Sequence, residues 1–314
     1  MARVALVTGV SGFVGANLAL HLAERGWRVV GLYRTERNNG PLDLLGVRGH
    51  PRVALVRGDV RDLALVRSVM AEEDITHVFH LAAQAIVSRA IRDPLGTVST
   101  NVLGTATVLE AARAVGVERT VIQSTDKVYG EGADRREDAP LRPKCIYSAT
   151  KVAADLLAQA YRRVYDMDVV VVRPSNLYGP GDTNPRLIPD AIRSYLSGRR
   201  HRVRNPAAVR EWTYITDLLS ALELLATEEL GGHHVFNVGS GEVASVAQVA
   251  HLIAEHFPEV GPPEFLDPSQ VPETLKRAEV VGQTLDTTLC LLYTSDAADD
   301  GESVDLGGRR SIKK

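Results

Sequence analysis

Tyr147 and Lys151 are the side chains whose types and spacing most clearly predict chemistry. Their separation of four residues places them on one face of a helix, although the same spacing also arises by chance in helices. Half-ionising a free phenol at neutral pH requires a pKa shift of about 3 units, or about 4 kcal/mol. A fixed ammonium, together with a second positive charge bound nearby, can supply a stabilisation of that order. Tyr147 would then act as a base toward a sugar or alcohol hydroxyl, which Ser124 and Thr125 could hold.

A glycine-rich segment at residues 8–15 (TGVSGFVG) predicts a dinucleotide site. It lies between an apolar strand expected at 3–8 and a helix expected at 13–25. Small residues let the backbone approach a pyrophosphate, and the helix presents free N–H groups and the positive end of its dipole. The alternative is a tight turn that binds no ligand. The predicted cofactor contacts in this segment are Gly9, Ser11, Gly12, Phe13, Val14 and Gly15.

Further cofactor contacts are predicted at the carboxyl ends of later strands. Arg34 follows the second strand, where an acid often bonds the ribose 2′-hydroxyl. It could instead accommodate a 2′-phosphate, which favours NADP, or simply be an exposed arginine. Asp59 and Val60 follow the third strand and are expected beside the adenine. We therefore expect NAD or NADP as the cofactor. The remaining predicted contacts are Leu81, Ala82, Ala83, Asn101, Tyr147 and Lys151.

Alternating strands and helices predict an α/β fold, a doubly wound parallel (Rossmann) sheet with a smaller C-terminal substrate-binding lobe. We expect the dinucleotide-binding domain at residues 1–175, with 213–240 returning to it, and the lobe at 176–212 and 241–287. Ligands should bind at the carboxyl ends of the strands. The strands are predicted at 3–8, 28–33, 53–57, 76–80, 120–124, 168–173 and 235–238. The helices are predicted at 13–25, 62–72 (capped by Asp62), 94–115, 147–165 and 245–256.

The motifs together resemble the extended short-chain dehydrogenase/reductase family of nucleotide-sugar enzymes over about residues 3–287. The resemblance implies a catalytic triad of Thr125, Tyr147 and Lys151. It also implies a nucleotide-sugar substrate held partly by Asn176 and a diphosphate contact from Arg210. The matching segments are TGVSGFVG (8–15), GDVRD (58–62), HLAAQ (80–84), TNVLGT (100–105), STDKVYG (124–130), YSATK (147–151), RPSNLYGPGD (173–182) and REWTYITD (210–217).

The two residues after Thr125 bear on which reaction of this family to expect. Epimerases that invert C4 usually carry small or inert residues there, whereas this chain has Asp126 and Lys127. A 4,6-dehydratase oxidises C4, loses water across C5 and C6, and returns the hydride to C6, so it needs an additional acid and base. By resemblance, Asp126 would protonate the departing C6 hydroxyl, and Lys127, as a neutral amine, would take the C5 proton. The alternative is an ion pair at a strand end.

The same residues guide the choice of substrate. Dehydratases that act on dTDP-glucose carry Asp-Glu at this place, whereas Asp-Lys is similar to CDP-glucose 4,6-dehydratases and to inverting UDP-N-acetylglucosamine 4,6-dehydratases. Residues 204–212 (RNPAAVREW) resemble the CDP-glucose branch, and Arg204 and Arg210 are candidates for a diphosphate clamp. We predict a dehydratase of CDP-glucose or a similar NDP-hexose. One alternative is a C4 epimerase. The other is a cofactor-binding sensor or scaffold, and the intact triad argues against this second alternative because a protein that only binds the cofactor need not retain all three residues.

Composition narrows the class of protein. The chain has 314 residues, 45% of them apolar and 24% charged, with a net charge of −3, as in a globular protein. The negative charge and sparse aromatics argue against a nucleic-acid partner. There is no apolar run of 18 residues, so no membrane span is expected. Two cysteines without metal-ligand spacing predict no metal and a cytoplasmic protein. The resemblance implies a homodimer, and His77 and His80 are expected to be packing residues.

The C-terminal segment is unlike the rest of the chain. Residues 290–299 (CLLYTSDAAD) and 303–310 (SVDLGGRR) resemble translated sequencing-adapter DNA, in that order. We therefore predict that residues 288–314 are a non-native read-through tail that replaces the natural C-terminus. The alternative is a flexible native tail. No functional prediction rests on this segment.

Overall fold

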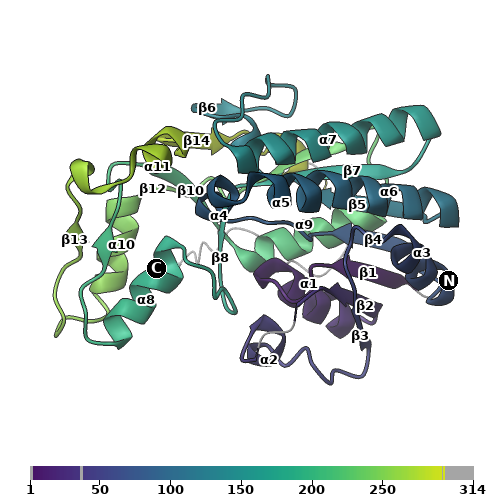
Figure 1. Cartoon of the computed structure of the whole chain (residues 1–314), viewed down its shortest axis with the longest axis horizontal. Coiled ribbons are helices and arrows are strands. Elements are labelled where there is room, and N and C mark those ends of the chain that lie inside the picture. The colour runs from purple at the N-terminus through teal and green to yellow at the C-terminus, as the bar shows by residue number, and fades with distance from the viewer. Residues whose placement is uncertain (1–2, 36–37, 292, 294–314) are drawn as a thin grey trace, which may run out of the picture.

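The computed structural model describes residues 3–35, 38–291 and 293. Its main sheet has seven parallel strands in the order β11-β7-β5-β4-β1-β2-β3. The strands from β7 to β3 are labelled in Figure 1. The order reverses between β1 and β4, which is where a doubly wound sheet binds its ligand. This confirms the predicted fold class. The strands are β1 Val4–Thr8, β2 Arg28–Tyr33, β3 Val53–Arg57, β4 His77–His80, β5 Arg119–Gln123, β7 Val169–Pro174 and β11 Val235–Val238.

Helices cover both faces of this sheet because its strands are apolar on both sides. In β1, Leu6 packs against α3 (Leu63–Glu72) and α6 (Gly104–Val115). Val7 faces the opposite side, toward α1 (Phe13–Glu24) and α9 (Ile215–Thr227). The long helix α7 (Ile146–Tyr165) packs beside α6. As predicted, Asp62 caps α3, since its carboxylate accepts a hydrogen bond from the Leu65 N–H at 3.0 Å.

The helix predicted at 94–115 is divided. It consists of α5 (Pro94–Val98), a π-helical turn (Ser99–Leu103) and α6, which follow one another without a break. A π turn adds a residue to the helical repeat and commonly marks a functional position. Asn101 lies inside this turn, and its side-chain oxygen accepts a hydrogen bond from the Gln84 N–H at 2.7 Å.

A second sheet joins the main domain to the smaller lobe at the left of Figure 1. Its order is β12-β10-β14-β6, and β8 pairs with β10. Its strands are β6 Gly132–Arg135, β8 Asn176–Tyr178, β10 Val209–Tyr214, β12 Val243–Ser245 and β14 Gly282–Leu285. The lobe also contains α8 Leu187–Leu196, β9 Arg202–Val203, α10 Val246–Ala254, β13 Glu264–Phe265 and α11 Glu273–Ala278. Two further short helices, α2 Pro41–Leu44 and α4 Val87–Arg92, follow β2 and β4.

The chain passes between the two sheets at strands that are far apart in the sequence. Strand β6 pairs with β14 near the C-terminus. Strand β11 lies in the main sheet beside β7, and the domain boundaries given above stay a prediction. The chain therefore crosses between the two sheets more than once.

Only the start of the segment predicted to be a read-through tail lies within the described residues, at 288–291 and 293. Cys290 is buried, and the Tyr293 hydroxyl donates a hydrogen bond to the Leu230 carbonyl at 2.8 Å. Residues 292 and 294–314 lie outside the description, so the origin of this tail stays a prediction. In the described part of the chain, no helix is long and apolar enough to cross a membrane. The same residues contain no cluster of three or more His, Cys, Asp or Glu side chains that could hold a metal.

Candidate active site

The glycine-rich loop forms a close-fitting backbone cradle between β1 and α1. A Cβ atom on Gly9 would lie 2.8 Å from the Ala82 Cα, and one on Gly15 would lie 2.3 Å from the Gly9 carbonyl oxygen. Helix α1 begins after Gly12 with no side-chain cap, so the N–H groups of its first turn point into the loop. A pyrophosphate is the kind of group that such a helix start accommodates. These residues therefore fit the phosphates of a dinucleotide.

Arg34 and Asp59 lie together at the ends of β2 and β3. The Arg34 Nη1 is 3.8 Å from Asp59 Oδ2, and the Arg61 Nη2 is 2.6 Å from the same oxygen. The hydrogen bonds from Arg61, with its charge and that of Arg34, hold the pKa of Asp59 at about 2. Asp59 is therefore ionised at neutral pH and partly compensates the positive charge of Arg34. Val60, next to it, is buried in the core below α6.

Tyr147 and Lys151 lie on the first turns of α7, both buried. The Lys151 ammonium donates a hydrogen bond to the Gln123 carbonyl at the end of β5. Burial raises the pKa of Tyr147 to about 12, although Arg186 and a hydrogen bond with Thr125 act to lower it. Burial lowers the pKa of Lys151 to about 8, and the nearby Asp155 opposes that shift. The chain's own groups thus keep the phenol protonated at neutral pH, consistent with the expectation that activation needs a further positive charge.

Asp126 and Lys127 follow Thr125 in a 3-10 turn (Asp126–Val128). The Asp126 Oδ1 accepts hydrogen bonds from the Thr125 hydroxyl at 2.9 Å and from Lys127 Nζ at 3.1 Å. Lys127 Nζ also lies 3.0 Å from Asn176 Oδ1. Lys127 lines the cleft described below, whereas Asp126 is almost fully buried behind it. The ion pair that the sequence offered as the alternative to acid and base roles is therefore present, and Lys127 of this pair faces the cleft.

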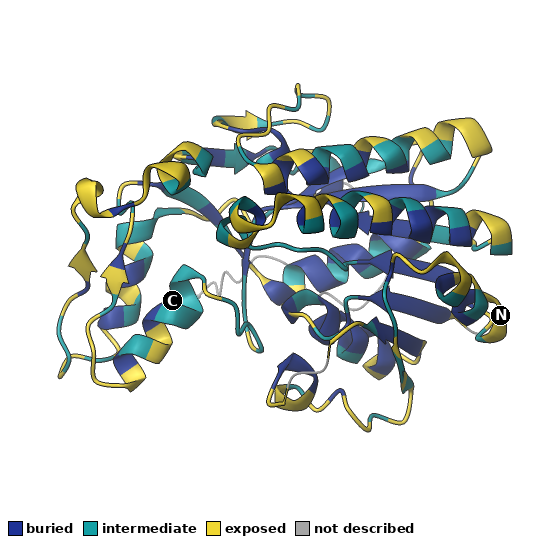
Figure 2. Cartoon of the chain, in the orientation of Figure 1, coloured by how far each residue is buried: buried dark blue, intermediate teal, exposed yellow. Residues whose placement is uncertain are grey.

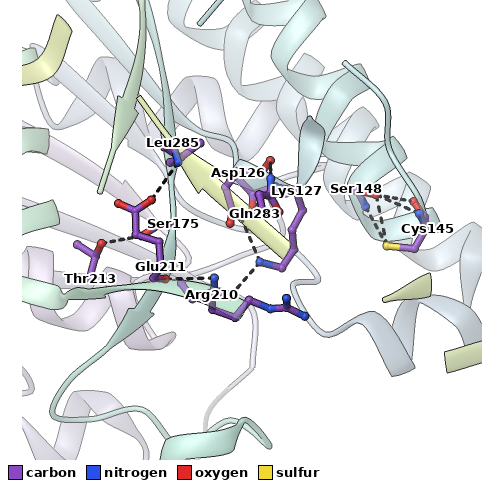
Figure 3. A network of polar contacts seen from close by, with 12 residues as sticks. Asp126, Lys127, Cys145, Ser148, Ser175, Arg210, Glu211, Thr213, Gln283 and Leu285 are labelled. Carbon is purple, nitrogen blue, oxygen red and sulfur yellow. Dashed lines mark hydrogen bonds and ion pairs between the residues drawn. The ribbon is translucent and has the colours of Figure 1, made fainter. Parts of the chain in front are cut away.

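Strand β14 supports this turn from behind, as Figure 3 shows. The Gln283 amide donates a hydrogen bond to the Asp126 carbonyl. The buried carboxylate of Glu211, in β10, accepts from the Leu285 N–H at 3.0 Å. Burial raises the pKa of Glu211, while the N–H groups of Gly241 and Leu285 act to lower it. The role of Gln283 is not visible in the sequence, because nothing in its local pattern connects it with Asp126 in a distant segment.

A cleft of about 500 Å³ opens between the main domain and the lobe. The Ser124 hydroxyl and the Gln123 side-chain oxygen are buried at its wall without a hydrogen-bond partner among the described residues. Gln123 was not predicted as a site residue, and its only signal was a polar side chain at the end of an apolar strand. The predicted site residues that line the cleft are Ser124, Thr125, Lys127, Tyr147, Asn176, Arg204 and Arg210.

Arg210 places a positive charge at the far side of the cleft. Its Nη1 donates hydrogen bonds to the carbonyls of Val209 at 2.9 Å and Val281 at 3.2 Å. Burial lowers the pKa of Arg210, and the Glu279 carboxylate, at 3.9 Å, acts to raise it. Arg204 and Arg186 line the same cleft, which therefore offers planar cations suited to a diphosphate.

The chain is similar in sequence to a nucleotide-sugar dehydratase and to a protein of glycan biosynthesis. It is 40% identical over 257 residues to a dTDP-glucose 4,6-dehydratase of Streptomyces griseus, covering 80% of this chain and 77% of that protein. It is 38% identical over 259 residues to the low-salt glycan biosynthesis protein Agl12 of Haloferax volcanii, covering 80% of this chain and 81% of that protein.

Solved structures agree with these matches. The double mutant of DesIV, a dTDP-glucose 4,6-dehydratase from Streptomyces venezuelae solved with NAD, has a TM-score of 0.80 and 27% identity over 92% of this chain and 89% of that one. The UDP-glucose 4-epimerase of Thermus thermophilus, solved with NAD, has a TM-score of 0.81 and 28% identity over 93% of each chain. The model of the NAD dependent epimerase/dehydratase family matches residues 5–239. As its motifs predicted, the chain belongs to the NAD-dependent epimerase/dehydratase family, and it is an enzyme of that family.

Proposed function

We propose that this chain is a nucleotide-sugar 4,6-dehydratase that uses NAD or NADP. The observation that carries the proposal is the position of Lys127, which faces the cleft beside Tyr147 and bonds to both Asp126 and Asn176. Interconverting two C4 epimers needs one proton-transfer group, whereas dehydration needs a further acid and base. The relatives that are named dTDP-glucose 4,6-dehydratases support the same reaction.

The cofactor would be held by the loop of residues 9–15 and by the strand ends that carry Asp59 and Ala82. The nicotinamide, when bound, supplies the acceptor and later the donor of a hydride. Arg34 would bind the 2′-phosphate of NADP. Asp59 already compensates part of the positive charge of Arg34, so the site does not depend on that phosphate. The site can thus accommodate either NAD or NADP.

Oxidation at C4 of the sugar begins with removal of the hydroxyl proton. Tyr147 takes this proton as phenolate, and the Lys151 ammonium stabilises the negative charge. Thr125, which is hydrogen-bonded to Tyr147, helps to hold the same oxygen. The Ser124 hydroxyl, buried without a partner among the described residues at the cleft wall, is available to a second sugar oxygen.

The elimination step uses the contact between Lys127 and Asp126. The resulting C4 ketone acidifies the C5 hydrogen, which Lys127 removes, while the C6 hydroxyl leaves as water with a proton from Asp126. This step requires Lys127 as a neutral amine and Asp126 as a protonated carboxyl. The ion pair reaches that state when a proton moves from Lys127 Nζ to Asp126 Oδ1 across their 3.1 Å contact. Asp126 is buried and does not line the cleft, so its proton reaches the sugar either when the turn of residues 126–128 moves or through the Thr125 hydroxyl, which bonds Asp126 and lines the cleft.

Two sets of observations bear on the nucleobase. The Asp126–Lys127 pair is similar to that of CDP-glucose and of inverting UDP-N-acetylglucosamine dehydratases, and residues 204–212 resemble the CDP-glucose branch, so the sequence favours CDP-glucose or a similar NDP-hexose. The relatives that are named dTDP-glucose dehydratases favour dTDP-glucose. We propose an NDP-glucose substrate, with CDP-glucose and dTDP-glucose as the two to be compared directly.

A substrate screen tests the proposal. The protein is incubated with NAD or NADP and each of CDP-, dTDP- and UDP-glucose, and the products are measured by mass spectrometry. We expect loss of one water to a 4-keto-6-deoxy sugar. Lys127→Met should stop water loss but allow C4 oxidation, whereas Arg199→Met, an exposed cation outside the cleft, should behave as the unaltered protein. A galacto-epimer of unchanged mass would instead support the epimerase, and cofactor binding without turnover would support a sensor or scaffold.

We also propose that the chain forms a homodimer through the helices on one side of the sheet. Helices α5 and α7 both carry exposed positions along their length (Figure 2). Large apolar residues are among them, Leu95 and Val98 on α5 and Leu156 and Val164 on α7. Such side chains favour burial against a second copy. Light scattering of the intact protein tests this, and Leu156→Glu should shift a dimer toward the monomer. An unaltered protein that is monomeric at micromolar concentration would contradict the proposal.

A further inference from the structure

His80 is a buried imidazole that the proposed reaction does not use. It ends β4, beside the dinucleotide loop, and is 2% exposed. Its Nδ1 lies 2.8 Å from the Thr8 hydroxyl and its Nε2 lies 3.0 Å from the Thr105 hydroxyl. Burial, with the charge of Lys151, lowers the pKa of His80 to about 3, so the ring is neutral at physiological pH.

The surrounding hydrogen bonds determine which ring nitrogen carries the proton. The Thr8 oxygen accepts from the N–H groups of Leu81 and Ala82, both at 3.2 Å, so its own hydrogen is directed to His80 Nδ1. The Thr105 hydroxyl donates to the Asn101 carbonyl at 2.6 Å, so it receives the hydrogen of His80 Nε2. A neutral imidazole has one donor and one acceptor, and only the Nε2–H tautomer satisfies both partners.

The same chain of hydrogen bonds continues to the catalytic helix. The Asn101 side chain donates to the Thr150 hydroxyl at 2.9 Å. Thr150 lies between Tyr147 and Lys151 on α7, and its hydroxyl donates to the Tyr147 carbonyl at 2.7 Å. A single directed path thus runs from the end of β1, through β4 and the π-helical turn, to the first turn of α7.

We propose that His80, as the neutral Nε2–H tautomer, is a positioning residue that fixes the dinucleotide loop relative to the helix that carries Tyr147 and Lys151. A side chain that only packs in the core would not need hydrogen bonds at both ring nitrogens. A charged imidazolium would carry a hydrogen on Nδ1, which would point at the hydrogen of the Thr8 hydroxyl instead of accepting it. The inference requires the NAD binding of the family but not the dehydration reaction.

Two substitutions separate the two halves of the path. His80→Asn keeps an acceptor near the position of Nδ1, toward Thr8, and His80→Gln keeps a donor near the position of Nε2, toward Thr105. We expect His80→Gln to raise the Kd for NAD about fivefold, the value of one lost hydrogen bond, and His80→Asn to change it less than about twofold. Hydrogen exchange of the peptide 146–165 should accelerate in His80→Asn but not in His80→Gln. His77→Asn, at the other end of the same strand, is the matched control and should affect neither measurement.

A spectroscopic measurement keeps the inference testable if either variant fails to fold. In the unaltered protein labelled with [15N]histidine, one imidazole should show the Nε2–H pattern unchanged from pH 5 to pH 8. A titrating signal or an Nδ1–H pattern for His80 would overturn the inference, as would equal effects of the two variants on the Kd for NAD. None of these measurements requires turnover of a nucleotide sugar, so failure of the proposed dehydration would remain distinguishable.

Discussion

Arg173 on β7 and Asp155 on α7 form a two-point ion pair inside the protein, with Nε 2.8 Å from Oδ2 and Nη2 3.0 Å from Oδ1. Both side chains are almost completely buried, and the Nη1 of Arg173 donates to the Tyr129 hydroxyl and the Glu137 carbonyl. The pair fastens α7 to the main sheet. Asp155 lies one helical turn beyond Lys151, so the same contact fixes the helix that carries the proposed catalytic pair.

The first prediction concerns this ion pair. Asp155→Asn should lower the free energy of unfolding by about 3–5 kcal/mol, because it leaves a buried guanidinium without its counter-charge. Urea unfolding monitored by circular dichroism measures the loss. Glu110→Gln removes a carboxylate from an exposed pair with Arg113 and should cause no measurable change. Equal stabilities of Asp155→Asn and the unaltered protein would show that the buried pair contributes little.

The second prediction is a pH dependence that arises from Lys151. Burial lowers its pKa from 10.5 to about 8, so the unfolded chain binds this proton more tightly than the folded one. The folded protein carries the full cost of a buried charge below pH 8, and this cost disappears as pH rises toward 10.5.

Lys151→Met removes that charge. At pH 7, removal of the buried charge should raise the free energy of unfolding by at most about 3 kcal/mol. Loss of the hydrogen bond to the Gln123 carbonyl should lower it by about 1 kcal/mol. The advantage of the variant should shrink when both proteins are unfolded in urea at pH 10. A difference that is independent of pH would contradict the assigned pKa shift, and turnover should be lost at every pH.

The third prediction concerns Ser124. Its hydroxyl is buried without a partner among the described residues, so Ser124→Ala should leave the stability unchanged or raise it by about 1 kcal/mol. If the hydroxyl binds the sugar, the KM for the nucleotide sugar should rise about fivefold. Ser197→Ala, an exposed serine after α8, serves as the control. An unchanged KM would exclude Ser124 from substrate binding.

The fourth prediction tests the dinucleotide cradle. Gly15→Ala would place a Cβ atom 2.3 Å from the Gly9 carbonyl oxygen, which forces the loop to shift. We expect the Kd for NAD to rise at least about tenfold, measured by calorimetry. Gly282→Ala is a matched control, because a Cβ atom there would meet nothing within 4 Å. Equal affinities of Gly15→Ala and Gly282→Ala for NAD would show that the cofactor does not approach this loop.

Local sequence patterns determined most of the main domain. Unbroken apolar runs predicted the strands of the parallel sheet, and the helix that carries Tyr147 and Lys151 follows from periodicity over 147–165, since α7 spans Ile146–Tyr165. The glycine loop was readable because its spacing and its place between a strand and a helix are local features. These signals depend on neighbours within a few residues, and therefore they survive without knowledge of the fold.

Tertiary structure decided which distant residues meet. Lys127 bonds Asn176, 49 residues away, and Gln283 bonds the Asp126 carbonyl across 157 residues. The π turn around Asn101 and the pairing of β6 with β14 also escaped prediction. Periodicity records which face of an element is buried but not which element covers it. For the same reason, the sequence indicated that His80 packs in the core, whereas its tautomer follows only from the partners that the fold brings to it.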